Sequence, residues 1–113
     1  MRILKFKKYN PEKIKGTEAY GGTVKIAVSK KADSRLNSGI FILKPGEALI
    51  RDVHENDEVF YLIEGRLTVQ AEDTDKMEIS KGEILLIPSG EVHYSKNPGK
   101  EDVKVFWCNI EPK

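Results

Sequence analysis

The chain has 113 residues, the size of one domain, which leaves no room for a second hydrophobic core. Charged residues make up 33% of it and hydrophobic residues 39%, a balance typical of a folded globular protein and not of a disordered one. The net charge of +1 excludes the strongly basic surface of a nucleic-acid-binding protein, and no apolar run approaches the roughly 20 residues that a membrane span needs.

Short apolar runs, rich in β-branched and aromatic residues, recur along the chain with turn residues between them. Near the start, Asn10 can cap a single helical turn in which Pro11 takes the first position. Eight strands are predicted after it, over residues 23–28, 39–43, 48–51, 59–63, 66–71, 76–79, 84–87 and 103–110. Strands and turns without a helical period predict one all-β domain, a barrel or sandwich spanning residues 1–113, with residues 1–22 as an N-terminal arm.

The first two of four candidate metal ligands lie at the end of the strand predicted over residues 48–51. Asp52 and His54 are two residues apart, so on an extended strand their side chains point to the same side. Glu58 follows a short turn, and the returning strand can place its carboxylate opposite that pair. An inward-facing glutamate in an apolar barrel is costly as an anion, by several kcal/mol, unless a cation or a hydrogen-bond donor meets it.

His93 comes from a third place in the chain, after the turn that contains Pro88 and Gly90. A metal ion bound by the two histidines and the two carboxylates would remove the cost of burying Glu58. The alternative is that both histidines are ordinary polar residues near the rim of a barrel, with Asp52 and Glu58 as their hydrogen-bond partners. Four residues of ligating types at this spacing favour the metal site.

Two motifs in the sequence resemble those of the cupins, a family of small jelly-roll barrels. The first spans residues 46–65 and comprises Gly46, Asp52, His54, Glu58 and Gly65. The family has a histidine where Asp52 stands. The second spans residues 82–97, matches the family throughout and comprises Gly82, Pro88, Gly90, His93 and Asn97. Together the motifs cover about half of the chain and imply a cupin-type jelly-roll β-barrel, also called a double-stranded β-helix.

The resemblance implies a site for one divalent metal ion, commonly Fe, Mn, Ni, Cu or Zn. The motif positions of His54, Glu58 and His93 are ligands in the family, and Asp52 takes the remaining ligand position by its place in the motif. Two imidazoles and two carboxylates favour Mn(II) or Fe(II), with Zn, Ni and Cu as alternatives.

Three functions are compatible with such a barrel. The first is a metal-dependent enzyme acting on a small organic molecule, for which the resemblance implies dioxygenase, decarboxylase, isomerase, epimerase or lyase chemistry, with no general acid or base identified. The second is a non-catalytic module that binds a small molecule or a sugar, with or without metal. The third is a metal-free structural cupin, for which Asp52 in place of the usual histidine is the main argument.

Two further expectations concern partners and location. The strand over residues 103–110 is apolar on both faces, which predicts a partner covering its outer side, and cupins of this size are commonly homodimers. We therefore expect a homodimer with a small-molecule ligand. Cys108 is the single cysteine and is expected in the core, and the opening residues are too charged for the core of a signal peptide. These features predict a cytoplasmic protein.

Overall fold

The structure, a computed structural model, describes residues 8–28, 35–52, 56–71 and 76–110, with the backbone alone for residues 50–52. The elements in these ranges are one short 3-10 helix and ten strands. In chain order they are η1 (Pro11–Lys13), β1 (Thr17–Ala19), β2 (Gly22–Val28), β3 (Leu36–Leu43), β4 (Ala48–Asp52), β5 (Glu58–Glu64), β6 (Arg66–Ala71), β7 (Lys76–Ser80), β8 (Ile84–Ile87), β9 (His93–Lys96) and β10 (Val103–Ile110).

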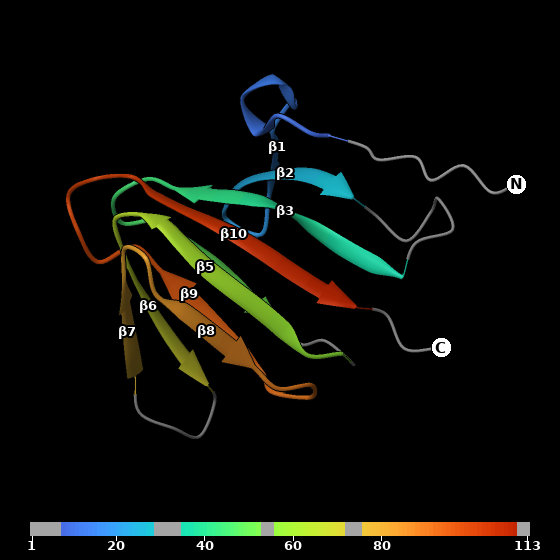
Figure 1. Cartoon of the computed structure of the whole chain (residues 1–113). Coiled ribbons are helices and arrows are strands. Elements are labelled where there is room, and N and C mark those ends of the chain that lie inside the picture. Colours follow the sequence, from blue (N-terminus) through green and yellow to red (C-terminus); the bar gives the residue numbers. More distant parts are fainter. Residues whose placement is uncertain (1–7, 29–34, 53–55, 72–75, 111–113) are drawn as a thin grey trace, which may run out of the picture.

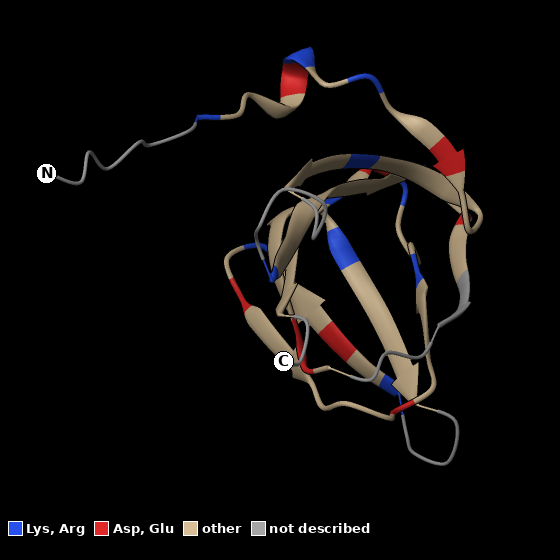
Figure 2. Ribbon diagram, turned by 90° about the vertical axis from the view of Figure 1, so that its right-hand side faces the viewer, with Lys and Arg blue, Asp and Glu red and all other residues tan. Residues whose placement is uncertain are grey.

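The strands form two antiparallel sheets that wrap around a common interior (Figures 1 and 2). The larger sheet has the order β1-β2-β3-β10-β5-β8, and the smaller has the order β4-β9-β6-β7. The last strand, β10, therefore lies between β3 and β5, so segments from opposite ends of the sequence are hydrogen-bonded neighbours. The predicted all-β jelly-roll fold is confirmed.

Alternating side chains fill the interior, as the two-residue period of a strand requires. On β10, Val103 and Val105 are fully buried, while Phe106, the residue after Val105, faces outward. The rings of Phe41 and Phe60, from β3 and β5, meet edge to face with their centroids 5.2 Å apart. The buried core comprises Phe41, Leu43, Phe60, Leu62, Leu67, Val69, Ile79, Ile87, Val103 and Val105.

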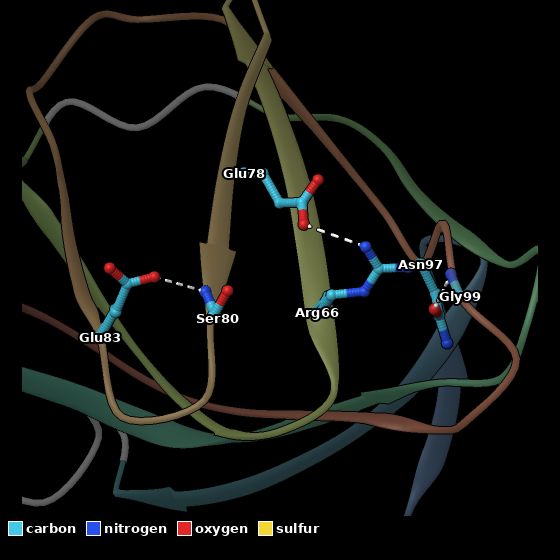
Figure 3. Close-up of polar contacts among 6 residues, drawn as sticks. All are labelled: Arg66, Glu78, Ser80, Glu83, Asn97 and Gly99. Carbon is cyan, nitrogen blue, oxygen red and sulfur yellow. Dashed lines mark hydrogen bonds and ion pairs between the residues drawn. The ribbon is translucent and has the colours of Figure 1, made fainter.

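Polar side chains bond to the backbone in the turns that link the strands (Figure 3). A side-chain oxygen of Glu83 accepts a hydrogen bond from the Ser80 amide at 2.6 Å, across the turn between β7 and β8. Asn97, after β9, accepts one from the Gly99 amide at 2.9 Å and donates to the carbonyls of Leu43 and Glu101 at 3.0 and 2.7 Å. Asn97, the last residue of the second motif, therefore joins the end of β3 to the loop before β10.

A second kind of contact in the same view lies on the surface. Arg66 on β6 and Glu78 on the neighbouring strand β7 form an ion pair at 3.2 Å (Figure 3). Because both side chains are largely exposed, solvent screens the pair, and it contributes little to stability.

The predicted helical turn is confirmed, since the Asn10 side chain accepts a hydrogen bond from the Glu12 amide at 3.0 Å and Pro11 begins the 3-10 helix. The predicted strands are also present, although β3 begins at Leu36 instead of residue 39. The sequence patterns did not predict β1, and the apolar runs did not single out β9, although His93 itself is expected on an extended strand. β9 reads His-Tyr-Ser-Lys, and it is held extended by pairing with β4 on one side and β6 on the other. Within the described ranges, no helix is long and apolar enough to cross a membrane.

Candidate metal centre

Two of the four predicted ligands, Glu58 and His93, meet inside one end of the barrel. Glu58 is the first residue of β5 in the larger sheet, and His93 is the first residue of β9 in the smaller one. Glu58 shares the inward face of its strand with the core residue Phe60, and only 5% of Glu58 and 4% of His93 are exposed. Glu58 Oε1 lies 3.7 Å from His93 Nε2, which is too long for a hydrogen bond. The fold thus brings together residues 35 positions apart in the chain.

The other two predicted ligands belong to the segment that leads from β4 to β5. The backbone of Asp52, the last residue of β4, pairs directly with that of His93. Asp52 therefore ends its strand beside the candidate site, although its side chain lies outside the described part of the structure. His54 lies entirely outside the described residues. Among the residues that are described, no three His, Cys, Asp or Glu side chains gather as a metal-binding group.

The imidazole of His93 is oriented so that one ring nitrogen can act as a ligand. Its Nδ1 lies 3.2 Å from the backbone carbonyl of Glu91, which can only accept a hydrogen bond. A hydrogen bond there requires the proton on Nδ1, so the neutral ring carries its lone pair on Nε2, the nitrogen that faces Glu58. Histidines that bind metals commonly use one nitrogen in this way while the other donates to a backbone carbonyl or a carboxylate.

Three asparagines support the carboxylate of Glu58. Asn109, on β10, donates from Nδ2 to Glu58 Oε2 at 3.0 Å. The Oδ1 atom of Asn109 accepts hydrogen bonds from Asn37 Nδ2 at 3.0 Å and from Asn56 Nδ2 at 3.1 Å. The sequence predictions did not single out Asn109. Strand alternation could have done so, because Asn109 follows Val103, Val105 and Trp107 on the inward face of β10.

Aromatic and aliphatic side chains surround the two buried ligand candidates. The ring centroids of Phe60 and His93 lie 6.3 Å apart in an edge-to-face arrangement, and Ile87 on β8 pairs with Glu58 across the sheet. Tyr94, the neighbour of His93, is exposed, because alternation along β9 turns it away from the interior. The candidate site is therefore a small polar group set against an apolar interior.

The single thiol of the chain, that of Cys108, lies on β10 next to Asn109. Cys108 is half-buried and belongs to the outward-facing positions of β10, so the expectation that it forms part of the core is only partly met. Burial, together with the negative charge of Glu58 on the adjacent strand, raises the pKa of the Cys108 thiol above its ordinary value. A thiol with a raised pKa is a poor nucleophile, and this one does not face the barrel interior.

The residues present fit a divalent metal ion. Ligand atoms at about 2.1 Å from the ion lie about 3.4 Å apart around a tetrahedral ion such as Zn(II) and about 3.0 Å apart around an octahedral one. The 3.7 Å between Glu58 Oε1 and His93 Nε2 is closest to the tetrahedral spacing and exceeds the octahedral one by about 0.7 Å. One donor is a carboxylate oxygen and the other an imidazole nitrogen, and both belong to buried side chains. A carboxylate buried against apolar side chains gains from a cation beside it.

Comparison with solved structures places the barrel among known folds. A predicted oxalate decarboxylase from Thermotoga maritima is 20% identical and aligns with a TM-score of 0.81 over 91% of this chain and 97% of that one. An oxalate decarboxylase from Bacillus subtilis is 19% identical and aligns with a TM-score of 0.82 over 98% of this chain and 31% of that one. At these identities the similarity shows a common fold.

Comparison of sequences identifies the family. An uncharacterised protein from Methanocaldococcus jannaschii is 29% identical over 66 residues, which are 58% of this chain and about half (52%) of that protein's length. Residues 39–109 match the profile of the cupin domain, and this match includes both motifs and every candidate ligand. The chain therefore belongs to the cupin family.

Proposed function

We propose that this protein binds one divalent metal ion through Glu58 and His93, with Asp52 and His54 completing the ligand set, and acts on a small organic molecule. The buried pair of Glu58 and His93 is the observation that carries the proposal. The carboxylate of Glu58 and the imidazole of His93 come from different sheets and are almost fully buried. Their nearest polar atoms lie 3.7 Å apart, without a hydrogen bond between them. A shared cation explains why a carboxylate oxygen and an imidazole nitrogen face each other in an apolar interior.

Several features support metal binding over an ordinary polar contact. Cupins commonly bind metals, and this chain carries the ligand types of the family at three of its four motif positions. The backbone of Asp52 pairs with that of His93 at the end of β4, which supports Asp52 as the fourth ligand. A set of two imidazoles and two carboxylates favours Mn(II) or Fe(II).

For the reaction, we propose chemistry on a small carboxylic acid. Among the activities common in cupins, decarboxylation comes first because two similar structures carry the name oxalate decarboxylase. When bound, the metal ion would polarise a carboxylate or carbonyl oxygen of the substrate as a Lewis acid. The apolar residues beside the site, including Phe60, whose ring meets that of His93 edge to face, would exclude water from the bound substrate.

Metal analysis of the untagged protein tests the proposal directly. After purification from cells supplied with Mn and Fe, elemental analysis should find close to one transition metal per chain. Glu58→Gln and His93→Ala should each lose most of that metal, because each removes a buried ligand. Tyr94→Phe is the matched control, since Tyr94 is the outward-facing neighbour of His93 and its loss should leave the metal content unchanged.

Two outcomes would change the assignment. A folded wild-type protein that takes up no Mn(II), Fe(II) or Zn(II), even when these are added in excess, would contradict the metal site and favour a structural cupin. A metal-loaded protein that turns over none of a panel of small carboxylic and keto acids, yet binds one of them, would favour the alternative of a non-catalytic binding module.

We also propose that the protein is a homodimer. Five large apolar side chains on the outside of the larger sheet form what is here called the outer apolar face: Tyr61, Ile84, Leu86, Phe106 and Ile110. Strand pairing places Phe106 beside Tyr61 and Tyr61 beside Ile84. Most small oligomers are symmetric dimers in which the same patch meets itself, and an uncharged apolar patch is complementary to its own copy.

A further inference from the structure

We propose that Asn109 is a positioning residue that sets the orientation of the Glu58 carboxylate, and that Asn56 and Asn37 lock Asn109 in place. The inference deepens the metal site proposed above and rests on it. Asn37 and Asn109 lie outside the two family motifs, and Asn56 lies within the span of the first motif but is not one of its defining residues. Their proposed role is to hold the candidate ligand Glu58, a role that the family motifs do not specify.

Strand register places the three inward side chains in one row across the larger sheet. Asn109 on β10 pairs with Asn37 on β3 at one side and with Glu58 on β5 at the other. Side chains directly opposite on neighbouring strands stand about 5 Å apart, which suits an amide that bonds on both sides. The next inward pair toward the core, Trp107 and Phe60, is apolar, so the row is the boundary between the polar end and the core.

The backbone carbonyl of Ile110 shows which atom of the Asn109 side-chain amide faces Glu58. The carbonyl of Ile110 can only accept, and it accepts from Asn56 Nδ2 at 2.9 Å. The same Asn56 nitrogen donates to Asn109 at 3.1 Å, so the atom of Asn109 that faces it must be the oxygen Oδ1. The nitrogen of Asn109 must then face Glu58, where it donates to Oε2 at 3.0 Å.

This chain of hydrogen bonds leaves the two oxygens of Glu58 with different roles. Oε2 is held by Asn109, and Oε1 is the oxygen that faces His93 Nε2. A glutamate side chain has three rotatable bonds, and fixing them before a ligand arrives lowers the entropic cost of binding. Groups that hold a metal ligand by its second atom typically contribute a factor of roughly 10 to 100 in metal affinity.

Titration with Co(II) tests the inference, because the visible absorption of bound Co(II) reports both affinity and ligand geometry. In Asn109→Leu, a change of similar shape without polar atoms, we expect Co(II) to bind roughly 10- to 100-fold more weakly than in the wild type, with an altered absorption spectrum. Val105→Ala is the matched control on the same strand, since it opens a cavity in the core far from the ligand atoms. It should lower the melting temperature and leave the affinity and the spectrum unchanged.

Asn56→Ala provides a second test that does not remove a core side chain. Asn56 is half-buried just before β5, so its loss should leave the barrel folded while freeing the Asn109 amide to turn. We expect a smaller loss of Co(II) affinity in the same direction and the same spectral change. If Asn109→Leu does not fold, the Co(II) affinity and spectrum of Asn56→Ala test the positioning role alone.

The outcomes separate this inference from the metal site itself. If the wild type binds Co(II) and both asparagine variants bind it with wild-type affinity and spectrum, the metal site stands and the positioning role is wrong. If affinity falls equally in Val105→Ala, the effect is a general loss of stability and the positioning role is again wrong. A wild type that binds no Co(II), Mn(II) or Zn(II) overturns the proposed function and, with it, this inference.

Discussion

Three buried polar residues at and just after β9, His93, Ser95 and Asn97, differ in the partners of their side chains. His93 faces Glu58, and Asn97 is bonded to backbone groups in the following loop. Ser95 lies between them, pairs with Leu49 and Val69 on its two neighbouring strands, and is 1% exposed. Its hydroxyl has no hydrogen-bond partner among the described residues. A buried hydroxyl without a partner costs about 1 to 3 kcal/mol.

Replacing Ser95 with alanine should therefore stabilise the protein. We expect the free energy of unfolding of Ser95→Ala, from urea denaturation, to exceed that of the wild type by about 1 kcal/mol. Ser38→Ala is the control, because Ser38 is also buried on a strand but its hydroxyl is not a fully buried group without a hydrogen-bond partner. A clear loss of stability in Ser95→Ala would mean that the hydroxyl is satisfied in solution, for example by a buried water.

The ionisation of the Cys108 thiol reports the negative charge of Glu58. Since its pKa is raised above the ordinary value of 9.0, by burial first and by Glu58 second, the folded protein keeps the thiol proton at pH values where the unfolded chain loses it. The folded state then binds more protons than the unfolded state, so stability falls as the pH rises through 9.0. Below that pH the two states are equally protonated, and the contribution is constant.

Alkylation by iodoacetamide follows this pKa directly, because the thiolate is the reacting form. At a pH near 9.0, folded wild-type protein should react more slowly than the same chain in denaturant. Glu58→Gln should react faster than folded wild type, since one of the two causes is removed, and Glu78→Gln, an exposed change on the other sheet, should not. Equal rates for wild type and Glu58→Gln would show that the charge of Glu58 does not reach the thiol.

At the scale of the elements, the connections between strands depend on a few glycines with positive φ. Gly65 joins β5 to β6 with φ of +84°, and Gly82 joins β7 to β8 with φ of +90°. Both conformations disfavour any residue with a side chain. The two sites differ in their surroundings, since a Cβ on Gly65 would lie 2.7 Å from the Asp102 carbonyl oxygen, whereas one on Gly82 would meet nothing within 4 Å.

Alanine at the two glycines should separate backbone strain from steric contact. Gly82→Ala should cost about 1 kcal/mol of stability from the unfavourable φ alone. Gly65→Ala carries the same strain and must also move the backbone before β10, so we expect a loss of more than 2 kcal/mol. Urea denaturation of both variants measures the difference. Equal losses would mean that the loop containing Asp102 yields without cost.

At the scale of the whole molecule, the outer apolar face is the feature that a single chain does not explain. Within the described residues, Ile84 and Leu86 lie on β8, which ends the larger sheet, and both are more than half exposed. Apolar surface of this extent on one side of a small domain commonly marks an interface. The proposed homodimer would cover it and would also complete the burial of β10 on both faces, which the sequence pattern predicted.

Analytical ultracentrifugation of variants tests the dimer. Wild type should sediment as a dimer, and Leu86→Glu should sediment as a monomer, because it places an unpaired charge within an apolar contact. Met77→Glu is the matched control, since Met77 is an exposed apolar residue on β7 in the other sheet. A monomeric wild type, or a dimeric Leu86→Glu, would contradict the proposed interface.

The candidate site was predicted from sequence in part. The spacing of Glu58 and His93 within the two motifs was sufficient to name them together, and the structure brings them within 3.7 Å. The predicted ligand His54 and the side chain of Asp52 lie outside the described residues, so their roles stay predictions. Asn109 was missed because an asparagine at the end of an apolar strand has no motif around it, and only the pairing of β10 with β5 places it against Glu58.

Local sequence determined most of the strands, the turns and the fold class of this protein, because alternation, turn residues and motif spacing are properties of neighbouring residues. What only the tertiary structure decided is which distant residues meet. β9 forms a strand because β4 and β6 flank it, and Glu58 is oriented because β10 lies between β3 and β5. Hydrogen bonds between strands far apart in the chain exist only once the barrel closes, so no local pattern can contain them.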